Sequence, residues 1–113
     1  MKRNMDLIKE IMLKVEEESS VYKINGYSKE EINYHTKLLI DSEFIEGKYH
    51  YNRQTAKRFV DRVIIHDVTM SGYDFLDILN DDNKFKIIKD LGKNLSMEAI
   101  KISMKQAIVT MMG

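Results

Sequence analysis

Residues 28–45 read SKEEINYHTKLLIDSEFI and carry the strongest local structural signal of the chain. Ser28 is a typical N-cap, and Glu31, three residues later, completes a capping box. Apolar positions then recur at helical spacing and predict one buried stripe, formed by Ile32, His35, Leu38 and Leu39. The opposite side is expected to face solvent and carries Glu30, Asn33, Tyr34, Lys37 and Asp41. This stretch therefore predicts a central amphipathic helix that passes directly into a strand.

Two shorter elements are expected before this helix. From Met5 to about Glu18, apolar side chains recur at helical spacing and predict an amphipathic helix. The run VYKINGY, residues 21–27, alternates in character and contains an Asn25–Gly26 turn signal. We therefore expect a short strand and a turn where many winged helices have their second helix.

A hairpin is expected after the central helix. Residues 44–51 predict a strand, and residues 62–69, RVIIHDVT, are rich in β-branched side chains and predict its partner. The connection at residues 52–61 is polar and basic. Together these segments predict an antiparallel β-hairpin.

Three further helices are expected in the C-terminal part. Ser71, followed by Asp74, is interpreted as the N-cap of the first, whose apolar stripe is Phe75, Leu76 and Leu79. Asp81 or Asp82 caps the second, with Phe85, Ile88 and Leu91 inward and Gly92 as a left-handed C-cap. Ser96 caps the third, which runs to about Met112.

This order of elements predicts an α+β, mostly α fold. We expect a winged helix-turn-helix core (helix, short strand, helix, β-hairpin wing, helix) with a C-terminal helical extension. The core would span residues 1–92, and residues 93–113 would form a helix that packs or dimerises.

Composition restricts the classes of function. The 113 residues suffice for one domain, and the formal net charge of zero argues against a strongly basic, non-specific nucleic-acid binder. No apolar run is long enough to span a membrane, and the start lacks the uninterrupted apolar segment of a signal peptide. The absence of cysteine excludes disulfides. We therefore expect a cytoplasmic protein without a membrane partner.

Three stretches resemble one uncharacterised family of small bacterial and prophage proteins, a domain of unknown function whose core is similar to a winged helix. They are MKRNMDLIKEIMLKVEE (1–17), GYSKEEINYHTKLLIDSEFIEG (26–47) and VTMSGYDFLDILNDD (68–82). The C-terminal LSMEAIKISMKQAI is similar more loosely. This chain departs from the pattern in two places: Ser42–Glu43 stands where a small residue and glycine are expected, and the hairpin tip matches no motif. The resemblance implies the fold; the family carries no assigned activity.

Charge along the chain suggests nucleic acid as a partner. Between Lys48 and Val60 there are four basic and no acidic residues, and a wing can lie along a phosphate backbone. A charged hairpin tip is equally what solubility and edge protection require. The central helix segment, residues 28–46, is net negative, which phosphate would repel. The candidate nucleic-acid-binding residues are Asn33, Tyr34, Lys37, Lys48, Tyr49, Tyr51, Arg53, Lys57 and Arg58.

The last helix is rich in methionine, which suits adaptable interfaces. Its apolar side contains five interface candidates, Met97, Ile100, Met104, Ile108 and Met111. Either this side packs against the first helix, or it forms the seam of a homodimer.

No feature of the sequence predicts an enzyme. The histidines His35, His50 and His66 lack the spacing of metal ligands, and no phosphate loop or nucleophile motif is present. We expect neither a metal nor another cofactor, and no small-molecule ligand is evident. Two hypotheses follow: a DNA-binding transcriptional regulator, or a phage-type protein–protein adaptor on the same scaffold.

Overall fold

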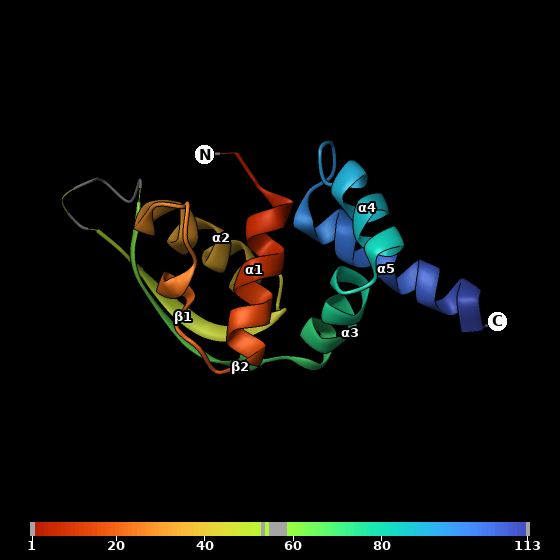
Figure 1. Ribbon diagram of the computed structural model, residues 1–113, viewed down its shortest axis with the longest axis horizontal. Helices are drawn as coiled ribbons and strands as arrows, with labels where there is room; N and C mark the ends of the chain where they lie inside the picture. The colour runs from red at the N-terminus through yellow and green to blue at the C-terminus, as the bar shows by residue number, and fades with distance from the viewer. Residues whose placement is uncertain (1, 53, 55–58, 113) are drawn as a thin grey trace.

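The structure, a computed structural model, describes residues 2–52, 54 and 59–112, with backbone alone for residues 105–112. Over these residues the fold is α+β and mostly helical (Figure 1). The elements in chain order are α1 (Met5–Glu16), the 3-10 turn η1 (Val21–Lys23), α2 (Lys29–Asp41), β1 (Ile45–Tyr51), β2 (Val60–Val68), α3 (Met70–Leu79), α4 (Asp82–Leu91) and α5 (Met97–Met112).

The predicted capping box of α2 is confirmed. The Ser28 hydroxyl accepts a hydrogen bond from the Glu31 amide (3.1 Å), and the Glu31 carboxylate accepts one from the Ser28 amide (3.2 Å). Of the predicted stripe, Ile32, His35 and Leu39 are buried. The N-terminus of α2 is therefore fixed by side chains that are adjacent in the sequence.

The predicted strand at residues 21–27 is wrong. Val21–Lys23 form a 3-10 turn, which the Ser20 hydroxyl caps by accepting from the Tyr22 amide (3.2 Å). Val21 and Ile24, three residues apart, are both buried, so one face of a tight helical turn meets the core. The turn predicted at Asn25–Gly26 is present, and Gly26 has a φ of 90°.

The predicted hairpin is confirmed. β1 and β2 pair antiparallel, with Lys48 opposite Ile64 and His50 opposite Arg62, and the register is irregular between Glu46 and Gly47 and between His50 and Tyr51. One face of the hairpin covers α2. The contact is close at Gly47, where an added Cβ would lie 3.3 Å from Cδ1 of Ile40 on α2. The other face points away from the helices.

One of the three C-terminal helices begins at a different cap than the sequence predicts. Thr69, not Ser71, caps α3, since its hydroxyl accepts from the Gly72 amide (2.9 Å). Asp81 caps α4 as predicted, and the Ser96 hydroxyl accepts from the Ala99 amide (3.1 Å) at the start of α5.

Two expectations for α4 are corrected. Gly92 is not left-handed, because its φ is −63°. Leu91 is exposed, whereas Ile88 is buried and Phe85 packs against the core. Arg3 donates to the carbonyl oxygens of Gly92 and Leu95, so the N-terminal segment satisfies acceptors at the end of α4.

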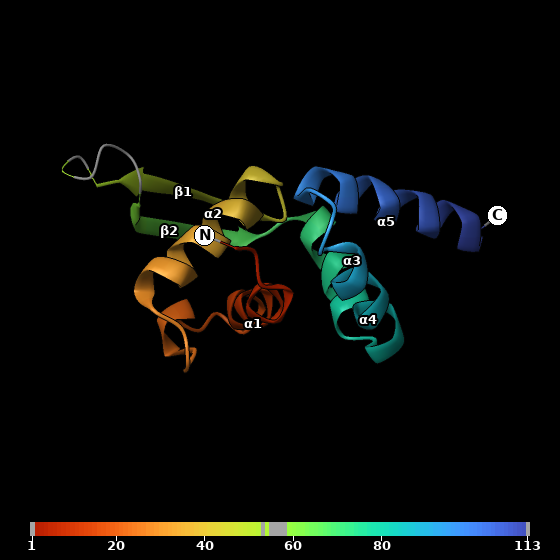
Figure 2. The same ribbon diagram turned by 90° about the horizontal axis from the view of Figure 1, so that it is seen from above.

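The core lies where α1 packs against α2, β2 and α3. Phe44 and Phe75 stack at its centre with ring centroids 4.3 Å apart. The hairpin and α5 extend from this core in opposite directions (Figure 2). Lys101 ties α5 to the end of α2, since its ammonium donates to the Ser42 carbonyl oxygen (2.8 Å) and lies 5.4 Å from the Phe44 ring centroid.

Candidate nucleic-acid interface

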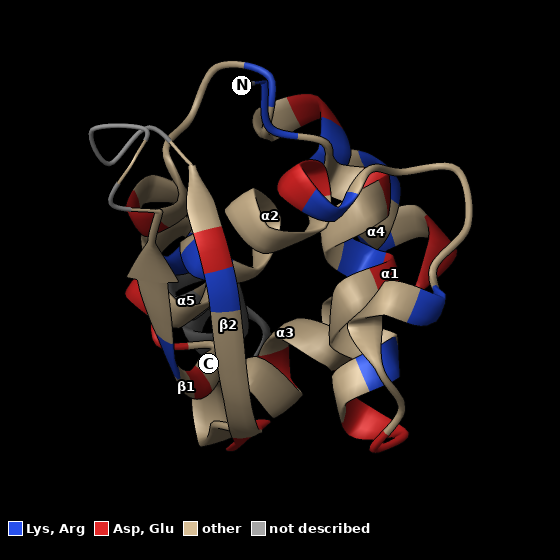
Figure 3. Ribbon diagram, turned by 90° about the vertical axis from the view of Figure 1, so that its left-hand side faces the viewer, with Lys and Arg blue, Asp and Glu red and all other residues tan. Residues whose placement is uncertain are grey.

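The outer face of the hairpin carries basic side chains from both strands. Lys48 and His50 alternate along β1, and Arg62 lies opposite His50 on β2. Because side chains two residues apart share a face of a strand, these three lie on one surface, which we call the hairpin basic face. All three are exposed, and none forms an ion pair with another described residue. Acidic and basic positions are adjacent on β2, as Figure 3 shows.

A second group joins the end of α2 to the inner face of β1. Asp41 accepts a hydrogen bond from the Tyr49 hydroxyl (2.7 Å) and one from the Lys37 ammonium (3.1 Å). The same ammonium lies 5.5 Å from the Tyr49 ring centroid, and the Tyr51 ring meets Tyr49 edge to face. We call these four residues the Asp41 cluster.

The Asp41 cluster raises the pKa of two of its members, Tyr49 and Lys37. The hydrogen bond to the Asp41 carboxylate, with partial burial and the negative charge, raises the pKa of Tyr49 to about 12. Burial alone would lower the pKa of Lys37, but the hydrogen bond and charge of Asp41 outweigh it, so this pKa is raised. The positive charge of Lys37 is therefore largely balanced by the Asp41 carboxylate within the protein.

Asn33, expected on the outer side of α2, is buried. It is 1% exposed, accepts a hydrogen bond from the Tyr22 hydroxyl (2.5 Å) and donates to the carbonyl oxygens of Val60 (3.1 Å) and Asp61 (3.3 Å). The prediction that it faces solvent is wrong, because the carbonyl groups of β2 offer its amide a buried partner. Asn33 holds the hairpin on α2 and cannot reach a base edge in this conformation.

The remaining nucleic-acid candidates lie in different places. Tyr34 is half-buried on α2, with its ring edge to face against His35 at 5.2 Å between centroids. Lys48 is on the hairpin basic face. Arg53, Lys57 and Arg58 lie outside the described residues. The structure thus brings together Lys37, Tyr49 and Tyr51, and separates them from Lys48 by the thickness of the hairpin.

The candidate nucleic-acid-binding residues predicted from sequence do not include His50 and Arg62, two residues of the hairpin basic face. The alternation of side chains along paired strands could have identified them, since a register that places His50 opposite Arg62 also places Lys48 on the same face.

The interface candidates on α5 divide into two groups. Met97, Ile100 and Met104 are buried and belong to the core cluster, so this part of α5 packs within the protein. Ile108 and Met111 lie where the structure describes the backbone alone. A homodimer seam along this helix stays a prediction, as does the division of the chain at residues 92–93.

Membrane-spanning helices and metal-binding clusters are both absent from the residues that the structure describes. No helix among them is both long and apolar enough to cross a membrane. No group of three or more histidine, aspartate or glutamate side chains is arranged to hold a metal ion within this part of the chain.

Comparison with known proteins identifies the family. The family model described as "Hypothetical protein (DUF2513)" matches residues 2–98. An "Uncharacterized protein" of Haemophilus influenzae (strain ATCC 51907 / DSM 11121 / KW20 / Rd) is 33% identical over 122 aligned residues, which cover 99% of this chain and 98% of that protein. No solved structure matches the chain significantly. The chain therefore belongs to the DUF2513 family, whose function is not characterised.

Proposed function

We propose that this protein binds duplex DNA as a small regulator, through a winged helix-turn-helix core. In this proposal α2 is the helix presented to the major groove and the β1–β2 hairpin is the wing. The order α1, η1, α2, hairpin, α3 supports it, with the 3-10 turn η1 in the place of the second helix. The hairpin also packs closely on α2, so the proposed wing and helix are held in a fixed arrangement.

The observation that carries the proposal is the hairpin basic face. Lys48 and Arg62 are cations without a carboxylate partner among the described residues, and His50 lies beside them. Cations on an exposed surface can replace the counterions condensed on DNA, which supplies affinity without sequence preference. Arg53, Lys57 and Arg58 follow in the connection between the strands and would extend this charge.

The Asp41 cluster determines how α2 would contribute. Asp41 neutralises Lys37, so Lys37 supplies little attraction to phosphate. Tyr34 remains as a half-buried polar side chain of α2, and Tyr49 contacts Lys37 and Asp41 from the hairpin, with Tyr51 beside it. Affinity would therefore come mainly from the hairpin, and α2 would contribute hydrogen bonds.

The test compares two double variants that remove the same charge. Lys48→Ala/Arg62→Ala removes the cations of the hairpin basic face, whereas Lys84→Ala/Lys86→Ala removes two exposed cations of α4. Fluorescence anisotropy with labelled random duplex DNA measures each dissociation constant at fixed salt. We expect the hairpin variant to bind at least roughly tenfold more weakly and the α4 variant to stay near the wild type. Equal affinity of the two variants would refute the assignment of this face.

A second candidate function is a protein–protein adaptor. It is favoured by large apolar side chains exposed on three C-terminal helices: Met70 (88% exposed), Tyr73, Ile87 (60%) and Ile102. A stoichiometric protein partner that co-purifies after nuclease treatment would favour the adaptor. Recovery of DNA without such a partner would exclude it.

A further inference from the structure

The outer edge of β2 is bordered by a groove instead of a strand. The sheet of the described residues has the order β1–β2, so β2 is paired along one edge. Its N-terminal end is covered, because the Asn33 amide donates to the carbonyl oxygens of Val60 and Asp61. Farther along, β2 borders a groove whose other wall is the end of α1, the segment that joins α1 to η1, and the start of η1.

The groove between β2 and this segment has a volume of about 450 Å³. Its apolar lining comes from Val15 and Val21 on one side and from Val63 and Ile65 on the other. Ser19 and Ser20 add hydroxyl groups to the lining. The volume lies within the range of about 300–1,000 Å³ that is usual for binding pockets. The groove thus combines an unpaired strand edge with apolar walls.

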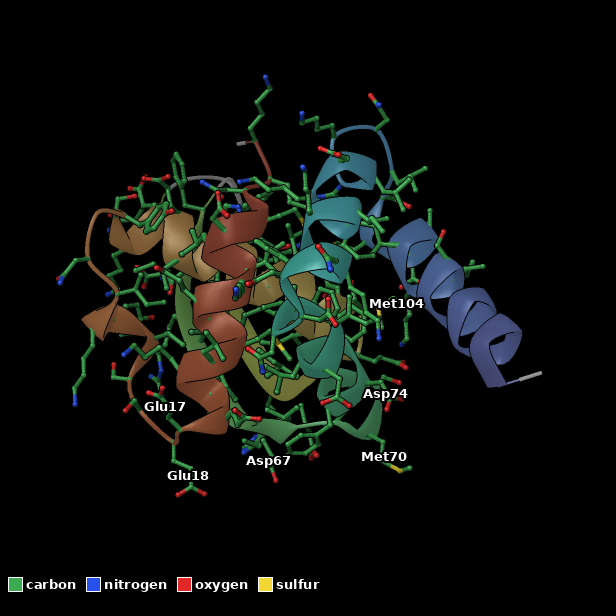
Figure 4. The ribbon with its side chains drawn as sticks, turned by 45° about the vertical axis from the view of Figure 1, so that its right-hand side comes forward. Glu17, Glu18, Asp67, Met70, Asp74 and Met104 are labelled. Carbon is green, nitrogen blue, oxygen red and sulfur yellow. The ribbon has the colours of Figure 1, made fainter. Side chains whose placement is uncertain are left out.

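One end of the groove is acidic. Glu18 and Asp67 line it from opposite sides, and Glu17 lies next to them at the end of α1 (Figure 4). Neither Glu18 nor Asp67 forms an ion pair with another described residue, and both are exposed. These carboxylates favour an occupant that brings positive charge.

Glu18 also has a backbone conformation that glutamate seldom adopts. It follows α1 with a φ of 61°, in the left-handed position where helices usually place glycine. Glu43 has the same conformation after α2, with a φ of 62°, but it lies near Lys101 and does not line the groove. The chain therefore contains two matched left-handed glutamates, of which one borders the groove.

We propose that this groove binds an extended, lysine- or arginine-bearing segment of another protein, which pairs with β2 as an additional strand. An exposed strand edge offers backbone donors and acceptors to such a segment, and side-chain pockets beside it give selectivity. The inference goes beyond the proposed binding of DNA and does not depend on it. It uses the edge of β2 toward α1, whereas the proposed DNA contact uses the outer face of the hairpin.

The probe is a fluorescein-labelled heptapeptide of alternating lysine and valine. Two controls are the alternating glutamate–valine heptapeptide and a lysine–valine heptapeptide with a central proline, which cannot complete a strand ladder. We expect the first peptide to bind with an affinity that falls with salt, and the two controls to bind at least roughly tenfold more weakly. Absence of binding by the first peptide, or equal binding by the proline peptide, would overturn the proposal.

A matched pair of variants tests the position. Glu18→Gly and Glu43→Gly each remove one carboxylate and each suit a left-handed φ. We expect Glu18→Gly to weaken peptide binding by roughly threefold and Glu43→Gly to leave it unchanged. If both variants weakened peptide binding equally, the peptide would be responding to the overall negative charge of the protein. That result would refute binding in the groove.

Hydrogen exchange supplies a readout of the pairing itself. Amide groups of β2 that do not face β1 should exchange more slowly when the lysine–valine peptide is bound. Binding without added protection in β2 would contradict strand addition.

Discussion

The backbone amide of Asn4 donates a hydrogen bond of 2.8 Å to Nε2 of His35, which joins the start of α1 to the middle of α2. The other ring nitrogen, Nδ1, lies 2.7 Å from the carbonyl oxygen of Glu31 and must donate to it. Both bonds require a neutral imidazole with its proton on Nδ1. His35 is 1% exposed, so this connection lies inside the protein.

We predict that stability falls in mild acid because of His35. Burial lowers the pKa of His35 below 6.5, although the hydrogen bond to Glu31 opposes this. An unfolded chain therefore binds a proton at this site more readily than the folded protein does. The contribution of His35 is fully present above about pH 6.5 and is lost as pH falls toward the lowered pKa. Urea unfolding between pH 7.5 and pH 5 measures this slope.

Replacement of His35 tests the same connection. His35→Phe should lower the free energy of unfolding at pH 7.5 by about 1–3 kcal/mol, because the Asn4 amide loses its buried acceptor. It should also flatten the dependence on pH. His66→Phe, at an exposed position of β2, is the control for replacing a histidine, and the slope of His35→Phe is compared with the wild-type slope. If His35→Phe kept that slope, another group would be responsible.

We predict that Gly72 tolerates no side chain. An added Cβ would lie 2.6 Å from Cγ1 of Val68 and closer still to the carbonyl oxygen of Phe44, a rigid backbone atom. Gly72→Ala should therefore lower the free energy of unfolding by about 3 kcal/mol or more, or prevent folding. Denaturant unfolding followed by circular dichroism measures this free energy.

Gly92→Ala is the matched control for Gly72. The Cβ added there would meet Cγ of Met5 at 3.0 Å and the carbonyl oxygen of Ile88 at 3.1 Å. The Met5 side chain can move, and the backbone contact is much looser than the one at Gly72. Because the φ of Gly92 is −63°, alanine also fits the backbone. We expect a change within about 1 kcal/mol in either direction. Equal costs at the two positions would contradict the close approach of α3 to Phe44.

We predict that Glu43→Gly stabilises the protein. Glu43 holds a φ of 62°, and glycine relieves a left-handed conformation that costs other residues about 1–2 kcal/mol. The ion pair with Lys101 spans 3.7 Å on an exposed carboxylate, so its loss should matter little. The expected gain is about 1 kcal/mol in denaturant unfolding. Glu43→Ala, which removes the charge and keeps the strained backbone, should show no gain.

The Asp41 cluster predicts one late tyrosine titration. In the folded protein Tyr49 should ionise near pH 12, which absorbance at 295 nm can follow after an assignment with Tyr49→Phe. Asp41→Asn weakens the hydrogen bond that the Tyr49 hydroxyl donates to the carboxylate and removes the charge that opposes the phenolate, so the pKa of Tyr49 should fall toward 10. Since the folded pKa is raised, this site stabilises the fold up to about pH 10 and loses that effect as pH rises further. An unchanged titration in Asp41→Asn would contradict the cluster.

The sequence predicts those elements whose signals are local. The Ser28–Glu31 capping box joins neighbours in the chain, and the β-branched run of β2 is continuous, so both were predictable. The basic character of the hairpin was also visible, because charge is a property of composition.

What the sequence does not predict depends on contacts between distant residues. Asn33 is polar and lies in a polar segment, yet it is buried. Its side chain forms hydrogen bonds with the carbonyl groups of Val60 and Asp61 and with the Tyr22 hydroxyl. Thr69 replaces Ser71 as the cap of α3 because its hydroxyl also donates to the Glu43 carbonyl oxygen at 2.5 Å. Such partners become neighbours when the chain folds.

The salt dependence of wild-type binding to random duplex DNA tests the proposed function most directly. If the hairpin basic face contacts phosphate, affinity should fall by roughly tenfold or more between about 50 mM and about 200 mM salt, with a linear logarithmic plot. Fluorescence anisotropy at four or more salt concentrations gives the slope. No binding at the lowest salt concentration, or binding that does not weaken with salt, would contradict DNA binding by this protein.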